Sequence, residues 1–307
     1  MSRPWRVVAR PSPLSRRQAE EAEGALREAF PGRGVERREV LSHGDRDQNL
    51  PFRDMGIQGI FEKEVNREVL EGRADLAVHS LKDLPMELPE PLCILAVLPR
   101  GPPGDLLVGP TVPSVWDGLA QGTRVGTTSV RRQALVRFHA PQCTILPVRG
   151  NVGTRLEKLQ RGEFDALLLA EAGIRRLGLP AAGTPLDPHI AVPAPGQGTI
   201  ALVGCRSLEE PLQRLRQRAA TTWREIQVER AAFARMGSGC SMASGAFAET
   251  APDGRIHLYV AEWKPDGSAR RRSHLILEPE DDPSVARAAM NELSRAPWEP
   301  RSGRGAE

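Results

Sequence analysis

Short apolar runs alternate with helical patterns over the first two thirds of this chain, and this alternation limits the fold more than any other feature. The pattern begins with strands at residues 6–9, 35–41 and 74–78 and helices at about 15–30 and 60–71. Strands that alternate with helices of this length form α/β layers, so we expect largely parallel sheets. Ligands of such sheets bind at the carboxyl ends of the strands, and that edge is where functional residues are expected.

Two segments rich in proline and glycine, residues 99–104 and 192–198, interrupt this pattern. Between them lies a second α/β series, with strands at 106–108, 124–126, 144–148 and 166–169. A further strand at 199–204 follows the second break. We therefore expect the chain to leave a first lobe (1–99 and 199–217), build a second (100–198) and return. This path gives two hinged lobes with a cleft between them.

The pattern changes after residue 217. A helical stretch at about 222–236 precedes strand-like runs at 245–248, 256–261 and 273–277 and a last helix at about 283–294. This order predicts a small α+β domain over residues 218–295. The segment 296–307 is polar and contains glycine and proline, so we expect a disordered tail.

Composition excludes several classes of function. The 307 residues are 40% hydrophobic, as in a globular protein, and no apolar stretch approaches the roughly 20 residues that cross a bilayer. Basic and acidic residues number 42 and 39, and this net charge of +3 disfavours nucleic-acid binding. The four cysteines form no C-x-x-C pair, so no metal site is expected. The first ten residues lack the apolar core of a signal peptide, which favours a cytoplasmic protein without a membrane partner.

Two arginine-bearing turns lie close together in the second α/β series, at residues 126–132 and 149–155. Each follows an apolar run and opens a helical stretch, so backbone N–H groups and guanidinium groups would converge on a ligand with several carboxylates or phosphates. Cations in the first turn of a helix oppose its dipole unless an anion compensates them. Arginine is also abundant on solvated surfaces, but two such turns in succession favour a binding site. Their candidate residues are Thr127, Thr128, Ser129, Arg131, Arg132, Arg149 and Arg155.

A lysine and an aspartate follow the strand at 74–78 closely. Lys82 and Asp83 would face the predicted cleft, where Asp83 could accept or donate a proton and Lys82 could hold an acidic substrate. A salt bridge within a loop is the alternative, and the two arginine turns favour the functional interpretation. His79, inside the strand, is expected to be a hydrogen-bonded core residue rather than a base.

Two other segments contribute candidates. Near the N-terminus a strand is again followed by an arginine and a hydroxyl residue, Arg10 and Ser12, and Ser12 or Ser15 would also cap the next helix. Cys240 lies in a glycine-rich turn directly after a helix, which is a poor place to bury a thiol. Exposure suits a nucleophile or a covalent attachment point, and an incidental loop cysteine is the alternative that position alone leaves open.

Four segments together resemble the hydroxymethylbilane synthase family, also called porphobilinogen deaminase. They are VHSLKDLP (78–85), VGTTSVRRQ (125–133), VRGNVGTRL (148–156) and PGQG (195–198), and the resemblance runs in order from about residue 6 to 265. It implies two hinged lobes like those of periplasmic binding proteins and a third domain whose cysteine holds a dipyrromethane cofactor through a thioether bond. It also implies a transferase that condenses four porphobilinogen molecules head to tail. Ammonia would leave at each addition, and hydrolysis would release linear hydroxymethylbilane.

The resemblance assigns roles to the candidate residues. Cys240 matches the attachment position of the cofactor, and Asp83 matches the catalytic aspartate, with Arg10 and Arg149 assisting deamination. The cofactor and the growing chain would be held by Ser80, Lys82, Thr127, Thr128, Ser129, Arg131, Arg132 and Arg155. The incoming porphobilinogen would be bound by Arg10, Ser12, Arg149, Arg155, Arg176 and Gln197. The resemblance also implies a monomer.

Two segments depart from the family pattern. Residues 52–61 match a mobile lid, but Asp54 and Gln58 replace lysines and Ile57 replaces a glycine. Residues 236–243 differ from the usual sequence around the cofactor cysteine. These departures motivate one alternative, a diverged paralogue with weak or no activity. A non-catalytic protein that binds carboxylate ligands with the same lobes is the other.

Overall fold

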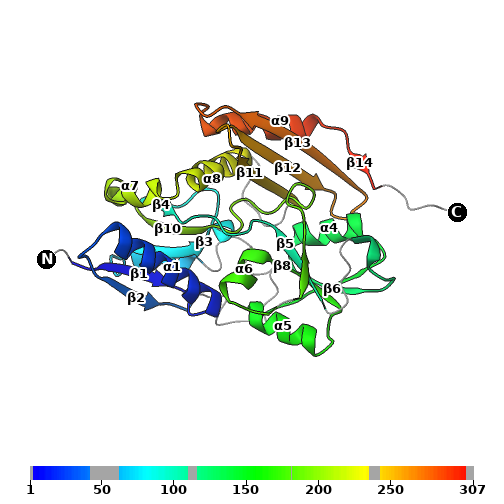
Figure 1. Cartoon of the computed structure of the whole chain (residues 1–307), viewed down its shortest axis with the longest axis horizontal. Helices are drawn as coiled ribbons and strands as arrows, with labels where there is room; N and C mark the ends of the chain where they lie inside the picture. The colour runs from blue at the N-terminus through cyan, green and yellow to red at the C-terminus, as the bar shows by residue number, and fades with distance from the viewer. Residues whose placement is uncertain (1–2, 42–61, 110–115, 181, 235–242, 302–307) are drawn as a thin grey trace.

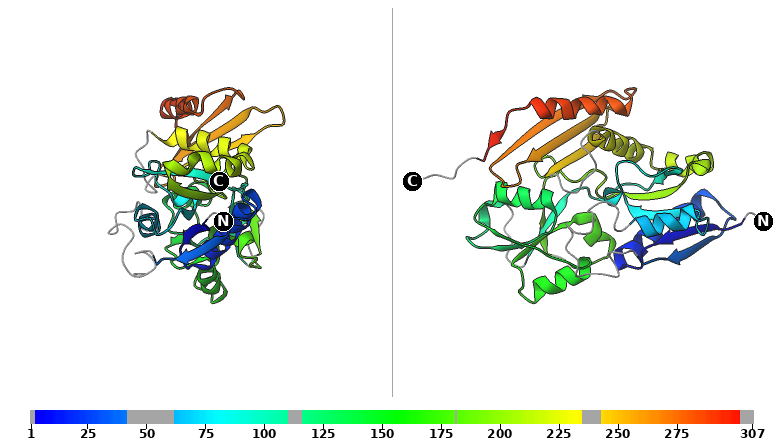
Figure 2. Two further views of the ribbon diagram at one scale, coloured as in Figure 1. Left: turned by 90° about the vertical axis from the view of Figure 1, so that its left-hand side faces the viewer. Right: turned by 180° about the vertical axis from the view of Figure 1, so that it is seen from behind.

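The computed structural model describes residues 3–41, 62–109, 116–180, 182–234 and 243–301. These residues form three sheets with helices packed on them. Figure 1 shows a first lobe at the left, a second lobe at the lower right and a third domain above both. The two views of Figure 2 show the same three bodies from the side and from behind.

The first sheet is mixed and has the strand order β2-β1-β3-β10-β4. One face is covered by α1 (Pro13–Ala29) and α7 (Glu209–Gln217), and the other by α3 (Lys63–Leu70) and α8 (Ala220–Phe233). Because both faces are covered, the central strands β3 and β10 are buried along nearly their whole length. The strands are β1 (Trp5–Ala9), β2 (Val35–Glu39), β3 (Leu76–Ser80), β4 (Leu92–Val97) and β10 (Ile200–Cys205).

The second sheet repeats this arrangement with the order β7-β6-β8-β5-β9. Residues of α4 (Val130–His139) lie in the core on one face, and residues of α5 (Val152–Gln160) and α6 (Glu171–Arg176) in the core on the other. Its strands are β5 (Asp105–Val108), β6 (Arg124–Gly126), β7 (Thr144–Leu146), β8 (Ala166–Ala170) and β9 (Gly183–Pro185).

The expectation of largely parallel sheets is only half right. In the first sheet β1 pairs in parallel with β2 and β3, but β10 is antiparallel to β3 and β4. In the second sheet β6 pairs in parallel with β7 and β8, but β5 is antiparallel to β8 and β9. The antiparallel strand of each sheet is the one that enters from the other lobe, β5 after residues 99–104 and β10 after residues 192–198.

The two crossover segments run side by side. The N–H of Gly101 donates to the carbonyl of Gly198 at 3.1 Å. A side chain does not fit at Gly198, because its φ is +89° and a Cβ atom would lie 2.6 Å from the carbonyl oxygen of Gly101. Arg100 ties this pair of segments to α8, where its guanidinium lies 2.6 Å from the buried carboxylate of Glu229.

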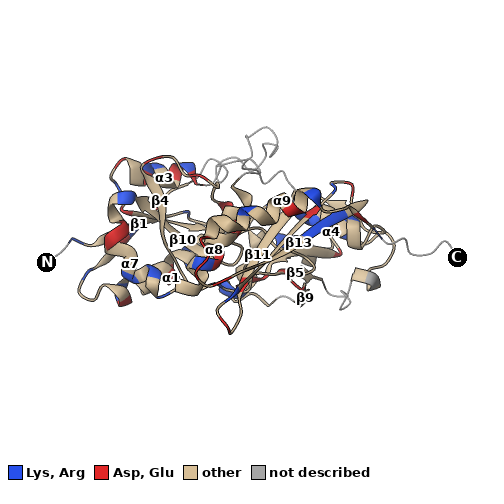
Figure 3. Ribbon diagram, turned by 90° about the horizontal axis from the view of Figure 1, so that it is seen from above, with Lys and Arg blue, Asp and Glu red and all other residues tan. Residues whose placement is uncertain are grey.

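The third sheet is an antiparallel meander of β11 (Ser244–Thr250), β12 (Ile256–Trp263), β13 (Ala269–Leu277) and β14 (Glu299–Pro300). Its core includes residues of α8 and α9 (Arg287–Arg295). Figure 3 shows basic residues along β13, and one of them, Arg270, pairs with Glu299 of β14. The predicted disordered tail is therefore wrong for the segment around β14, which the sheet and this ion pair hold, and residues 302–307 lie outside the described residues.

A histidine between two carboxylates connects the second lobe to the third domain. His189 Nδ1 lies 2.8 Å from Asp187 Oδ1, and its Nε2 lies 2.8 Å from Glu249 Oε1 on β11. Partial burial lowers the pKa of His189, but the hydrogen bonds to Glu249 and Asp187 more than offset this, so the pKa is raised above its usual 6.5. The protonated form is thus favoured in the folded protein.

We expect His189 to stabilise the protein in a pH-dependent way. Because its pKa is higher in the folded state, its contribution is complete below about pH 6.5 and is lost as the pH rises through the raised value. The side chains of His189, Glu249 and Asp187 are 39%, 43% and 51% exposed, so the effect should stay below about 1 kcal/mol. Thermal midpoints of the wild type and His189→Gln between about pH 5 and 9 measure it. A difference that grows with rising pH would contradict this assignment.

Candidate active site

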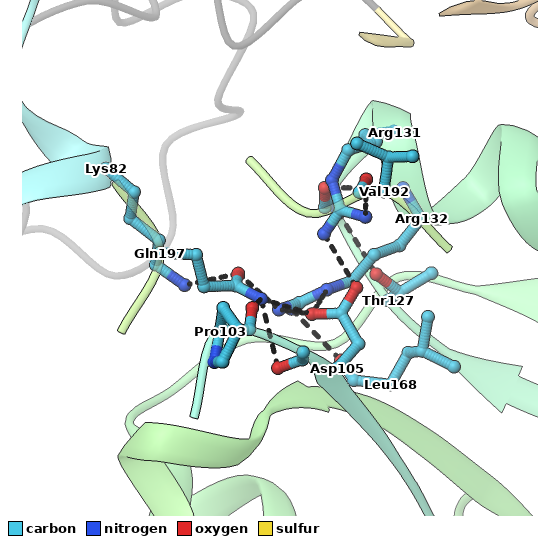
Figure 4. A network of polar contacts seen from close by, with 11 residues as sticks. Lys82, Pro103, Asp105, Thr127, Arg131, Arg132, Leu168, Val192 and Gln197 are labelled. Atoms are coloured by element: carbon cyan, nitrogen blue, oxygen red, sulfur yellow. Dashed lines mark hydrogen bonds and ion pairs between the residues drawn. The ribbon is translucent and has the colours of Figure 1, made fainter. Parts of the chain in front are cut away.

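The turn after β3 places Lys82 and Asp83 at the junction of the two lobes. This turn is a short 3-10 helix, Leu81–Asp83, and Leu81 is only 1% exposed, which anchors it in the core of the first lobe. Lys82 extends across the junction, where its Nζ donates to Gln197 Oε1 at 3.3 Å (Figure 4). Asp83 is exposed to solvent.

Arg131 and Arg132 lie in the first turn of α4 and share one buried carboxylate. Ser129 caps the helix by accepting a hydrogen bond from the backbone N–H of Arg132. The guanidinium of Arg131 lies 2.7 Å from Asp105 Oδ2, and that of Arg132 lies 2.7 Å from Asp105 Oδ1. Figure 4 shows both side chains converging on Asp105, with Gln197 donating to the same carboxylate. The anion that arginines require at a helix start is therefore supplied by the protein itself.

This network is buried and has an excess of positive charge. Asp105 is 0% exposed, and Arg131 and Arg132 are 4% and 7% exposed. Burial would raise the pKa of Asp105, but the two guanidiniums hold it well below its usual range, so the carboxylate stays ionised. Burial and the charge of Arg132 lower the pKa of Lys82 to about 8. The negative charges of Asp83 and Asp105 offset only part of this shift. One buried carboxylate thus faces two guanidiniums and a nearby ammonium group.

The second arginine turn brings Arg155 to the same junction. Asn151 caps α5 by accepting a hydrogen bond from the N–H of Thr154 at 3.0 Å, and Arg155 Nε donates to the carbonyl of Gly150 at 2.8 Å. Burial and the charge of Arg132 lower the pKa of Arg155 to about 10, and Asp83 partly offsets this shift. Side chains from the two lobes therefore act on one another across the junction.

The other predicted residues of the second lobe lie near these turns. Thr127 is buried, and its hydroxyl accepts a hydrogen bond from the N–H of Ser129 at 3.3 Å. The hydroxyl of Thr128 donates to the carbonyl of Val148 at 3.5 Å, and Arg149 is half-buried before α5. Arg176 on α6 joins the lobes, since it donates to the carbonyl of Gly198 at 2.8 Å and pairs with Glu21 of α1 at 3.2 Å.

A pocket of about 80 Å³ lies beside Asp83 in the first lobe. Ser12 caps α1, as predicted, by accepting a hydrogen bond from the N–H of Ser15 at 3.3 Å, and it also lines this pocket. His79 is a hydrogen-bonded core residue, as predicted, with Nε2 2.9 Å from Asn66 Oδ1 and a pKa that burial lowers to about 3. The lining residues are Arg10, Ser12, Leu14, Ser15, Gln18, Glu62, Val78, His79, Ser80 and Asp83.

Three residues of the site were not predicted from the sequence. Asp105 holds the two arginines, and an acidic residue at the start of the buried strand Asp105–Val108 is the signal that could have indicated it. Gln18 Nε2 donates to Ser80 Oγ at 2.7 Å. Glu62 is 5% exposed. Its pKa is raised, chiefly by burial and in addition by the charge of Asp83.

Four of the positions named from the sequence are not described by the structure. Cys240 and the lid positions Asp54, Ile57 and Gln58 lie outside the described residues. Among the helices that are described, none is both long and apolar enough to span a membrane.

These features define a class: two α/β lobes that meet at a cationic junction beside an exposed carboxylate, with a third α+β domain attached. Such a junction suits a ligand with several carboxylates. The family model described as "Porphobilinogen deaminase, dipyromethane cofactor binding domain" matches residues 5–214. The chain belongs to this family. It is a transferase of tetrapyrrole biosynthesis that forms hydroxymethylbilane from porphobilinogen, and its cofactor is dipyrromethane.

Two relatives are similar over nearly their whole length. The chain is 40% identical over 293 residues to a probable porphobilinogen deaminase of Hyperthermus butylicus, which covers 94% of this chain and 96% of the relative. It is 43% identical over 275 residues to a probable porphobilinogen deaminase of Ignicoccus hospitalis, covering 88% and 90%.

Two solved structures are similar to this chain at much lower sequence identity. The BvgS VFT2 domain of Bordetella pertussis has 18% identity and a TM-score of 0.42, with 71% of this chain and 86% of that chain covered. A probable amino-acid ABC transporter extracellular-binding protein of Bacillus subtilis has 9% identity and a TM-score of 0.45, with 71% and 91% covered.

Proposed function

We propose that the junction of the two lobes holds the dipyrromethane cofactor and the growing chain, and that Asp83 is the catalytic carboxylate beside them. The observation that carries this proposal is the approach of Lys82 and Asp83 in the first lobe to Arg132 and Arg155 in the second. Each pyrrole of porphobilinogen carries an acetate and a propionate. Every condensation therefore adds two carboxylates, which cationic side chains must balance.

The residues of the junction fit a cofactor with several carboxylates. Asp105 neutralises one of the two charges of Arg131 and Arg132, which leaves one positive charge for a ligand. Burial disfavours the charged forms of Lys82 and Arg155, and an anionic ligand would favour them again. When bound, the cofactor supplies the pyrrole carbon to which the first substrate is joined. Ser80, Thr127, Thr128 and Ser129 would add neutral hydrogen-bond donors.

Asp83 would act on the positive charge that the reaction generates. Loss of ammonia from porphobilinogen leaves an electron-poor azafulvene, and coupling builds positive charge on the pyrrole nitrogens. A carboxylate within hydrogen-bond distance stabilises that charge and can accept the proton lost after coupling. Arg10 and Ser12 line the pocket beside Asp83, which suits them to hold the carboxylates of the incoming substrate. Arg149, Arg155, Arg176 and Gln197 would complete this binding, and Arg10 and Arg149 would assist deamination.

We further propose that Cys240 carries the cofactor through a thioether bond. The protein would act as a cytoplasmic monomer without a nucleic-acid partner.

The three domains of the protein would comprise residues 1–99 with 199–217, residues 100–198, and residues 218–295.

We expect the intact protein to carry the mass of two linked pyrroles in denaturing mass spectrometry, because a thioether survives unfolding. The adduct should be absent from Cys240→Ser. It should persist in Cys93→Ser, a matched control that removes a half-buried thiol of β4. Wild-type protein that stays unmodified after incubation with porphobilinogen would contradict the proposal and favour a diverged or binding-only protein.

A further inference from the structure

Glu62 is a buried carboxylate that lines the pocket beside Asp83. It lies directly before α3 and is 5% exposed. Its side chain does not cap the helix. Its carboxylate accepts a hydrogen bond from its own backbone N–H, and among the described residues no ion pair joins it to a cation. A carboxylate in this position lacks most of its hydration and gains little from the described residues around it.

The charges around Glu62 suit the part of the pocket between Glu62 and Asp83 to a cation. Burial is the main cause that raises the pKa of Glu62, and the negative charge of Asp83 raises it further. Its own backbone N–H and the adjacent Lys63, whose side chain is exposed, act in the opposite direction without cancelling the shift. A ligand cation between Glu62 and Asp83 would remove the repulsion and compensate for lost hydration.

Porphobilinogen has a group of the required kind. Its aminomethyl substituent is an ammonium ion near neutral pH, while its acetate and propionate are anions. The same pocket offers Arg10 for an anion and the two carboxylates for a cation. Charges of both signs in the pocket thus complement charges of both signs in the substrate.

We propose that Glu62, together with Asp83, binds the ammonium group of the incoming porphobilinogen and selects substrates that carry it. This inference rests on the proposed role of the pocket in substrate binding. When the C–N bond breaks, its electron pair leaves with the nitrogen, so the group departs as neutral ammonia. The positive charge then lies on the pyrrole ring. The two carboxylates therefore face one positive charge both before and after the C–N bond breaks.

The test is a comparison of steady-state kinetics for the wild type and Glu62→Gln, which keeps the shape of the side chain and removes its charge. We expect KM for porphobilinogen to rise about tenfold or more, the usual cost of losing a charged hydrogen bond, and kcat to change by less than about threefold. The matched control is Glu71→Gln, which removes an exposed carboxylate at the other end of α3 and should leave KM unchanged. An unchanged KM in Glu62→Gln would overturn the proposal.

A second measurement separates recognition of the amine from a general effect on the pocket. The probe is porphobilinogen with a methyl group in place of the aminomethyl group, used as a competitive inhibitor. Its inhibition constant should be the same for the wild type and Glu62→Gln, because the probe has no ammonium group. Equal weakening of probe and substrate would overturn the proposal, as would loss of the pyrrole adduct in mass spectrometry of Glu62→Gln.

Failure of the proposed function has a different signature. A wild type that binds porphobilinogen without turnover would contradict the enzymatic role of this site but not the role of Glu62. Calorimetric dissociation constants for porphobilinogen then replace KM, and the same difference of about tenfold between the wild type and Glu62→Gln is expected. Equal dissociation constants would overturn the proposal in that case too.

Discussion

Asp83→Ala should lower kcat for porphobilinogen condensation by about a hundredfold to ten-thousandfold, the range that general acid–base catalysis contributes. Asp83 is exposed on the turn after β3, so its removal should change stability by less than about 0.5 kcal/mol. The pyrrole adduct should remain, because the proposed attachment depends on the thiol and the cationic junction and not on this carboxylate. Ammonia release under saturating substrate measures the effect.

The matched control for this experiment is Glu87→Ala. Glu87 is also an exposed carboxylate, and it lies four residues further along the chain outside the pocket. We expect kcat of this variant to equal that of the wild type. Wild-type turnover in Asp83→Ala would show that the catalytic role is assigned to the wrong residue.

The second large effect is expected on stability, from Asp105→Ala. This substitution leaves the guanidiniums of Arg131 and Arg132 buried without their shared carboxylate, which should cost about 3–5 kcal/mol. It also removes a hydrogen-bond acceptor of Gln197. The denaturant midpoint of unfolding measures the loss. In the wild type, the lowered pKa of Asp105 means that this stabilisation is complete above the usual aspartate pKa and is lost as the pH falls through the lowered value.

Asp165→Ala is the control for Asp105→Ala because it breaks an ion pair of the same lobe that is exposed to solvent instead of buried. Asp165 pairs with Arg124 at 2.7 Å, but both side chains are more than 40% exposed. Such a pair contributes less than about 1 kcal/mol. Equal destabilisation by the two substitutions would show that burial of the Asp105 network has no energetic importance.

Much of the fold could be predicted from the periodicity of apolar residues. The predicted strands and helix around β1, α1, β6 and β8 are confirmed by the structure. Three of the elements that were not predicted have weak local signals. α7 contains a proline near its start and many charged residues, α6 has six residues, and β9 has three with no apolar pattern. Their structure depends on packing against the sheets, which local periodicity does not report.

Prediction of the site was limited in a different way. The pattern of cations predicted Lys82, Arg131, Arg132 and Arg155 as candidate site residues, since charged residues that follow apolar strands are conspicuous in a sequence. The partner of the two arginines, Asp105, is 26 residues before Arg131 and becomes adjacent only through strand pairing in the second sheet. Glu62 looks like an ordinary acidic residue at a helix start, because a sequence does not show that its side chain is buried beside Asp83.

The exchange of strands between the lobes also bears on how the chain is made. β4 pairs only with β10 among the described strands of the first sheet, and β10 ends at Cys205. During synthesis, the edges of β3 and β4 therefore stay open until about the first two hundred residues have left the ribosome. The second lobe is built in that interval. Open strand edges promote association with other chains, so this interval is when the nascent protein most needs protection from aggregation.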